Sequence, residues 1–391
     1  MRTIIALCLV AACCSAKISA EQKCEPSATR SSTVQGQICK GALIFEDNFD
    51  FLDLSKWSHE VTLAGGGNWE FQVYWADPAN SFTSNGNLNI HPGKLADIYG
   101  NDFLYSGTLD LGPSCTQDWN FGCVRTGNSE NILNPATSAR LHTVNTFGFT
   151  YGTVEVRARI PAGDWIWPAI WMMPRYSVYG GWPTSGEIDI MESRGNRELG
   201  SFGGAGVNIG VEQVSSTMHW GPDFAHNRYY LTHWERNSVP GFNNDFHLYQ
   251  VEWTPGNIYY FNSSDRQKDN VLLCFVDYIK FSVDNVEQGT VTPPAGGFYE
   301  LGGFANEGIA NPWGSSKIAP FDQEFYLILN VAVGGTNGFF PDGVANPGGK
   351  PWSNASPTAF KDFWEGKAQW EPTWQGDTTD MLVDYVRVWA L

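Results

Sequence analysis

Alternating apolar and polar residues predict extended strands along this chain. Between residues 151 and 160, apolar side chains occupy every second position from Val154 to Ile160, with polar residues between them. This period of two is typical of an antiparallel strand with one buried face. Segments 87–90 and 385–389 repeat the pattern, and the nearly continuous apolar run 325–333 indicates a central strand.

Turn-forming residues separate these segments, and long helical periodicity is absent. Clusters of glycine, proline and asparagine occur at 334–335, 341–343 and 347–349. Many short strands joined by such turns predict an all-β sandwich or barrel. The composition shows no second break after Leu43, so we expect one domain over 41–391, preceded by a short polar tail at 17–40.

The first residues predict a secretory signal. Arg2 precedes an apolar run at 4–14, and small residues follow it. This order describes a signal peptide, whereas about 20 apolar residues are needed to span a bilayer. We expect residues 1–16 to be the signal, with cleavage after Ala20 as a second site, and a soluble secreted protein without a membrane span. The alternative is a buried N-terminal strand.

The cysteines predict two disulfides in the mature chain. Eight cysteines are present, and removal of the signal leaves five. Cys24 with Cys39 and Cys115 with Cys123 are pairs that lie close in sequence, and secretion favours their oxidation. Cys274 then remains without a partner.

Charge and aromatic content exclude several classes of protein. Lys and Arg number 24 and Asp and Glu 41, which gives a net charge of −17. So acidic a chain repels nucleic acid and anionic lipid, and neither is an expected partner. Seventeen tryptophans exclude wholesale disorder. The motifs of zinc peptidases, serine hydrolases and dinucleotide-binding proteins are absent, and we expect no metal and no cofactor.

Segment 186–193, Gly-Glu-Ile-Asp-Ile-Met-Glu-Ser, concentrates carboxylates on a predicted strand. Alternation places Glu187 and Asp189 on one face and the isoleucines on the other. A β-bulge near Met191 would return Glu192 to the acidic face, because an isolated carboxylate in the core is costly. Three crowded carboxyls should leave one protonated near neutral pH, and such a pair of acids suits retaining glycoside hydrolysis. The alternative is a solvated acidic face.

Tryptophans near this segment favour a carbohydrate ligand. Trp167 and Trp171 precede it and would share a strand face, and flat aromatic rings suit the apolar C–H faces of sugars. Segment 67–75 supplies similar candidates, among them Asn68, Trp69 and Glu70, with Tyr74 and Trp75 beside them. Packing into the core is the alternative for each aromatic residue.

Segments 167–171 and 186–193 together resemble glycoside hydrolase family 16. The closest likeness is to invertebrate β-1,3-glucanases and the related β-1,3-glucan-binding (Gram-negative-binding) proteins. Segments 216–221, 330–343 and 350–354 extend the resemblance, which covers about 44–391. It implies a jelly-roll β-sandwich of two packed antiparallel sheets with a concave glycan-binding cleft.

The resemblance also implies roles for individual residues. Glu187 would be the nucleophile, Glu192 the general acid and base, and Asp189 a support for the nucleophile. The extra residue at Met191 resembles the bulged, laminarinase-like form of the motif. His219 would lie near the acid and contact substrate or a carboxylate; a purely structural histidine is the alternative.

Both glutamates are present, whereas many binding-protein relatives have lost one or both. We therefore expect a monomeric, secreted endo-β-1,3-glucanase that hydrolyses laminarin-like β-1,3-glucan with retention. The alternative is a pattern-recognition protein of innate immunity that binds β-1,3-glucan or lipopolysaccharide with little or no catalysis. A digestive enzyme for mixed-linkage or algal glucan is a third reading. The tail at 17–40 is too short for an N-terminal glucan-binding module.

One segment departs from the family pattern. In relatives the strand at 257–261 should run almost directly into 282–284, but residues 262–281 intervene and include Cys274. We expect an inserted hairpin or an intron read-through. Asn262 and Asn354 begin glycosylation sequons; the first lies in this segment, and Pro357 follows the second.

Overall fold

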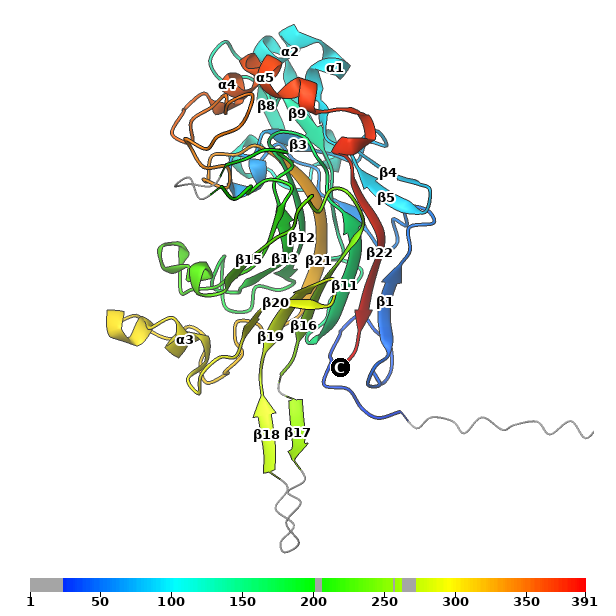
Figure 1. Ribbon diagram of the computed structural model, residues 1–391, viewed down its shortest axis with the longest axis vertical. Coiled ribbons are helices and arrows are strands. Elements are labelled where there is room, and N and C mark those ends of the chain that lie inside the picture. The colour runs from blue at the N-terminus through cyan, green and yellow to red at the C-terminus, as the bar shows by residue number, and fades with distance from the viewer. Residues whose placement is uncertain (1–23, 201–205, 256, 262–271) are drawn as a thin grey trace, which may run out of the picture.

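Two antiparallel sheets form most of the computed structural model, which describes residues 24–200, 206–255, 257–261 and 272–391 (Figure 1). Seven strands of the eight-stranded sheet follow the order β20-β19-β16-β11-β22-β5-β4, and β1 pairs with β22. The seven-stranded sheet has the order β15-β14-β13-β12-β21-β10-β2. The sheets pack as a jelly-roll β-sandwich, which confirms the predicted fold class, and neither closes into a barrel.

The strands of the larger sheet are β1 (Leu43–Asp47), β4 (Ser81–Ser84), β5 (Asn87–Ile90), β11 (Gly152–Arg159), β16 (His247–Trp253), β19 (Ile279–Val283), β20 (Val286–Val291) and β22 (Met381–Trp389). Those of the smaller sheet are β2 (Ser58–His59), β10 (Arg140–His142), β12 (Ile166–Pro174), β13 (Glu187–Ser193), β14 (Gln213–His219), β15 (His233–Asn237) and β21 (Phe325–Val333). Short strands β3 (Gln72–Tyr74), β6 (Gly93–Lys94) and β9 (Ala136–Ser138) form a third sheet, and β7 (Thr108–Asp110) pairs with β8 (Val124–Thr126).

The strands predicted from periodicity are confirmed. In β11 buried and half-buried residues alternate without interruption, because its apolar face packs toward the smaller sheet. The apolar run 325–333 is β21, which lies between β12 and β10 and is buried along almost its whole length. The core between the sheets is therefore built from the residues whose alternation was visible in the sequence.

A second, aromatic core lies at one end of the sandwich. Short helices gather there: α1 (Leu95–Tyr99), α2 (Asn101–Ser106), α4 (Ala359–Glu365) and α5 (Lys367–Trp370) (Figure 1). Phe71 packs edge-on against Trp352, and Phe363 stacks on Trp370 with ring centroids 4.4 Å apart. This lobe fixes segment 67–75 beside the open face of the smaller sheet. Helix α3 (Gly297–Leu301) lies away from this lobe.

The structure describes the two ends of the segment in which an insertion is expected. Strand β17 (Asn257–Phe261) pairs with β18 (Leu272–Val276) in a separate hairpin that projects from the sandwich (Figure 1). The main sheet continues from Trp253 of β16 directly to its partner Ile279 of β19. Phe281, placed inside 262–281 from the sequence, is a fully buried core residue. Residues 279–281 thus belong to the main sheet and its core, and an insertion at 262–281 stays a prediction.

The N-terminal tail is attached to the domain where it is described. Cys24 is bonded to Cys39 and Cys115 to Cys123, so both predicted pairs are present. The Arg30 N–H donates to the Thr150 carbonyl at 3.0 Å. The signal peptide predicted at 1–16 and the sequon at Asn262 lie outside the described residues. Among the described helices, none combines the length and the apolar character that crossing a membrane requires.

Packing between the sheets predicts a specific loss of stability. Ile188 is fully buried on the core side of β13, between two of the candidate carboxyls in sequence. We expect Ile188→Ala to lower the free energy of unfolding by about 2–5 kcal/mol, because it leaves a cavity under the strand. Urea unfolding would measure this. Val178→Ala, at an exposed position, is the control and should change stability by less than about 0.5 kcal/mol. An equal effect of the two changes would contradict the packing.

Candidate active site

A β-bulge in β13 places the three predicted carboxyls on one face. Two consecutive residues of β12 pair with Asp189 and Met191 of β13, so that β13 has one extra residue at this point. The extra residue turns Glu192 to the face of Glu187 and Asp189, while the apolar side chains Ile188, Ile190 and Met191 are buried in the core. The predicted bulge is confirmed. We call this side of the smaller sheet, turned away from the core, the cleft face.

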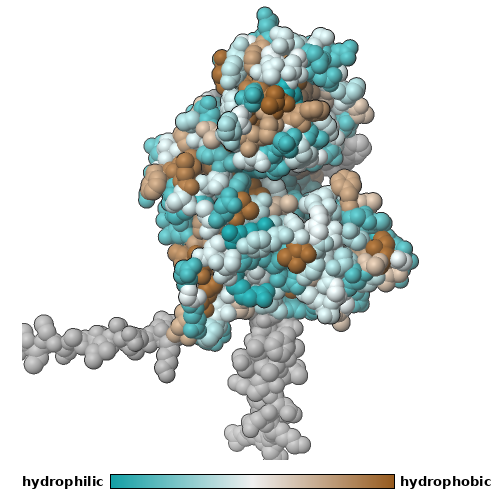
Figure 2. Space-filling model, turned by 180° about the vertical axis from the view of Figure 1, so that it is seen from behind, coloured by the Kyte–Doolittle hydropathy of each residue, from teal (hydrophilic) through white to brown (hydrophobic). Residues whose placement is uncertain are grey.

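The cleft face is concave, and the molecule is hollowed there. The strands of the smaller sheet bend in Figure 1. Figure 2, which shows the molecule from behind, has a hollow between an upper and a lower lobe at its right edge, which is the left edge of Figure 1. Side chains from several strands meet on this face because β10, β21, β12, β13, β14 and β15 lie side by side in it.

A turn before β13 brings in a tryptophan that the sequence analysis did not single out. Gly186 donates its N–H to the Pro183 carbonyl at 2.9 Å and has a φ of +83°, a conformation that favours glycine. The turn places Trp182 beside the predicted nucleophile, and its Nε1 donates to Glu187 Oε2 at 2.6 Å. A signal was present: an aromatic residue opens the turn-forming segment directly before the carboxylates.

Trp167 orients the predicted acid. Its Nε1 donates to Glu192 Oε1 at 2.9 Å, and its ring stacks on Phe339 with centroids 3.8 Å apart. The Arg194 guanidinium lies over the same phenylalanine ring at 4.2 Å. Trp167 was predicted as a sugar platform, but it is buried, and the structure gives it the further role of holding a carboxyl.

His219 lies beside the carboxyls, as the resemblance implied. Its Nε2 is 3.3 Å from Asp189 Oδ2, and its Nδ1 is 2.8 Å from the Asn227 amide nitrogen. The ring of Tyr229 stacks on it at 5.4 Å. Asn227, which the sequence analysis missed, thus fixes the imidazole so that its other nitrogen faces Asp189.

Crowding and burial shift the proton affinities in this cluster. Burial raises the pKa of Asp189 well above its usual range, and the charges of Glu187 and Glu192 raise it further. Burial also raises the pKa of Glu192, while the charge of His219 opposes this rise. For His219, burial alone would lower the pKa, but the neighbouring carboxyls, Glu187 first, raise it to about 9. His219 is therefore protonated near neutral pH, and Asp189 and Glu192 are both shifted toward their protonated forms.

One set of side chains within the described ranges has the geometry of a metal site. Ligand-type atoms of Glu187, Asp189 and His219 lie within 4.8 Å of one another. These residues are also the ones that the glycosidase chemistry would use: Trp182 donates to Glu187, and Asp189 and His219 form an ion pair with each other.

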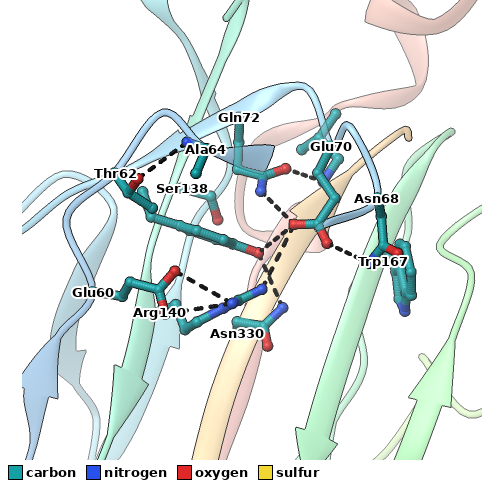
Figure 3. A network of polar contacts seen from close by, with 12 residues as sticks. Glu60, Thr62, Ala64, Asn68, Glu70, Gln72, Ser138, Arg140, Trp167 and Asn330 are labelled. Carbon is teal, nitrogen blue, oxygen red and sulfur yellow. Dashed lines mark hydrogen bonds and ion pairs between the residues drawn. The ribbon is translucent and has the colours of Figure 1, made fainter. Parts of the chain in front are cut away.

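A buried polar network lies under one side of the cleft (Figure 3). Glu70 was predicted to contact substrate, but it is only 2% exposed. Its carboxylate accepts from Asn68 Nδ2 at 2.9 Å and from Gln72 Nε2 at 2.7 Å, and Arg140 lies 3.7 Å away. Glu70, which lies just before β3, is thus behind Asn68 and orients the Asn68 amide.

The same network fixes Trp171. Its Nε1 donates to Asn330 Oδ1 at 2.6 Å, and the Asn330 amide donates to the Tyr74 hydroxyl at 3.1 Å. Arg140 lies 4.6 Å from the Tyr74 ring centroid and 5.3 Å from that of Trp171. Trp171 therefore stands on the cleft face with Trp167, as predicted, and its ring is held from the neighbouring strand.

The remaining predicted residues divide by exposure. Trp69 is half exposed in a turn beside Asn68, where a ligand can reach it. The indole N–H of Trp75, in contrast, donates a hydrogen bond to Asn80. The Asn354 amide donates to the Phe340 carbonyl at 3.0 Å and accepts from Lys350 at 2.7 Å. Glycosylation at Asn354 stays a prediction, and the attached glycan would have to displace the first of these bonds.

Known proteins match this chain over most of its length. The model of glycosyl hydrolases family 16 matches residues 111–265, which include β13. A β-1,3-glucan-binding protein of Penaeus monodon is 48% identical, over 89% of this chain and 90% of its own. Gram-negative bacteria-binding protein 1 of Drosophila melanogaster is 33% identical, over 95% of this chain and 69% of its own.

A solved structure shares the fold. The laminarinase from Rhodothermus marinus superposes with a TM-score of 0.52 and 26% identity, over 90% of this chain and 97% of that one. The bulged carboxylate strand, the family match across it and a relative that is nearly half identical agree with one another. The chain therefore belongs to glycosyl hydrolase family 16.

Proposed function

We propose that this protein is a secreted endo-β-1,3-glucanase that hydrolyses laminarin-like β-1,3-glucan with retention of configuration. One observation carries the proposal: β13 presents Glu187 and Glu192 on one face, each held by a tryptophan N–H. Burial raises the pKa of Glu192, which is the direction that a general acid requires. Retaining glycosidases need such a pair, one carboxylate to attack and one acid to donate.

Each residue has a step in the double displacement. Glu187 attacks the anomeric carbon while Glu192 protonates the departing glycosidic oxygen, which leaves a covalent glycosyl-enzyme. Glu192, now ionised, takes a proton from water, and the hydroxide oxygen displaces Glu187 from the sugar. Asp189 and His219 support the nucleophile by sharing protons and charge beside it.

The substrate class is supported by the relatives and by the cleft. The names of the first relatives refer to β-1,3-glucan, and the matched structure is a laminarinase. Trp171, Trp69 and Asn68 line the side of the cleft under which the Glu70 network lies, where rings and an oriented amide suit a sugar. We propose that these residues contact the glucan.

A recognition protein of innate immunity is the second candidate. Many similar proteins are named for binding glucan or Gram-negative bacteria and not for cleaving it. The same cleft would bind glucan without turnover if its acids were badly placed. Both glutamates are present here, each with a partner that orients it, and this favours hydrolysis. Gut expression would favour a digestive role and haemolymph expression a defensive one.

We also propose that the protein is exported and acts as a monomer. The two disulfides among the described residues suit an oxidising compartment. N-terminal sequencing of the mature protein would locate cleavage after residue 16 or 20, and peptide mapping would show whether 262–281 is present in it.

Amide substitutions separate catalysis from binding. We expect Glu192→Gln to lower kcat/KM for laminarin by about 10²–10⁴-fold, because the proton donor is lost, and Glu187→Gln to cost at least as much. Reducing-sugar release measures both, and curdlan pull-down should show unchanged binding. Binding by the wild type and both variants, with no hydrolysis by any, would instead establish a recognition protein.

Retention is a separate expectation. We expect the carboxyl carbons of Glu187 and Glu192 to lie about 5–5.5 Å apart in a crystal structure, and the first product to carry the β anomer. Proton NMR during early hydrolysis distinguishes the anomers. An α product would exclude the double displacement, since a single displacement inverts the centre.

The pH profile should respond to His219. Its positive charge lowers the pKa of Glu192, so His219→Gln should raise that pKa. The acid then keeps its proton to higher pH, and the basic limb of kcat/KM should move upward. His233→Gln is the matched control, because His233 contacts Thr217 and Glu235 and not the carboxyl cluster. A basic limb that stays in place in His219→Gln would show that Glu192 does not set it.

A further inference from the structure

Exposed aromatic side chains gather on the connection between β14 and β15. This connection contains two short 3-10 turns, Phe224–His226 and Tyr229–Leu231. Phe224 is 78% exposed and Tyr230 58% exposed, and the ring of Tyr229 lies between those of Tyr230 and His219. Single exposed apolar residues are ordinary, but a group of rings on one loop marks a surface that meets another molecule.

These rings form a continuous series with the candidate nucleophile. Trp182, whose indole N–H holds Glu187, has its ring 5.5 Å from that of Phe224 and 5.5 Å from that of His219. On the other side of His219 the rings of Tyr229 and Tyr230 follow, with centroids 6.1 Å apart. The exposed group thus begins inside the cleft and continues outward from it.

The loop that carries the rings is anchored at several points. Asp223 caps the first turn by accepting from the N–H groups of Ala225 and His226. Arg228 donates to the Gly302 carbonyl and pairs with Glu307 on the neighbouring segment. A ligand that meets these rings finds them already ordered, so binding costs little conformational entropy.

We propose that Trp182, Phe224, Tyr229 and Tyr230 form a second binding platform for β-1,3-glucan, on which a long chain rests after it leaves the cleft beside Glu187. The proposal rests on the proposed glucan ligand. Glucan is favoured as occupant because the rings are continuous with the cleft, whose Glu187 would attack the sugar. Aromatic faces also match the apolar faces of pyranose rings, while the acidic edges at Asp223 and Glu307 can accept hydroxyl hydrogen bonds.

The test compares long and short glucans by equilibrium binding. The double variant Phe224→Ala/Tyr230→Ala is made in the Glu192→Gln background, so that hydrolysis does not consume the ligand. We expect its Kd for laminarin to rise by about 5- to 30-fold, because two rings that the glucan would cover are lost. Its Kd for laminaritriose should be unchanged, because a short glucan can bind in the cleft without reaching these two rings. Phe224→Trp, which keeps a ring, should retain affinity for laminarin.

Phe51→Ala is the matched control, since Phe51 is an exposed phenylalanine next to β1 in the opposite sheet. Unchanged unfolding midpoints show that all variants fold. If the double variant binds laminarin like the control while the wild type binds and cleaves it, the platform is wrong and the proposed function stands; a protein partner would then be the occupant to test. If the parent Glu192→Gln protein does not bind laminarin, both the platform and the glucan ligand are rejected.

Discussion

Mutual repulsion among three carboxyl groups on one strand is the constraint that organises this site. Glu187, Asp189 and Glu192 would share charge in a face partly closed to water, where each ionised oxygen needs a donor. Trp182 and Trp167 donate to Glu187 and Glu192, and His219 forms an ion pair with Asp189. Burial first, and this crowding second, raise the pKa values of Asp189 and Glu192, which is the direction that acid catalysis requires.

These partners come from three different parts of the chain, and the sandwich brings them together. Trp167 stands on β12 and His219 on β14, the two strands that flank β13, and a turn before β13 returns Trp182 over its first residue. The aromatic lobe adds segment 67–75 at the other side, where Glu70 and Arg140 hold Asn68 and Trp171 from behind. Rigid strands and a buried second layer thus fix the groups that would meet a sugar.

Under the proposed function, hydrolysis and recognition would use the same surface, so one family could contain both. The sugar-facing groups on β12 and in the 67–75 segment do not depend on the acids, so loss of a glutamate would leave binding intact. Hydrolysis, in contrast, would require both glutamates and the contacts that orient them. A protein that retains them has kept the more demanding of the two arrangements.

The sequence by itself determined the all-β class, the main strands, the disulfide pairs and the acidic strand with its bulge. These follow from local rules: alternation decides which side chain is buried, and a carboxylate such as Glu192 cannot face the core. Only the tertiary structure decided that Glu70 is buried, that Trp167 holds Glu192, that Trp182 and Asn227 belong to the site, and that the main sheet resumes at Ile279. The physical reason is that each of these depends on contacts between segments distant in sequence or on which strand pairs with which, and no periodicity within one segment records its neighbours.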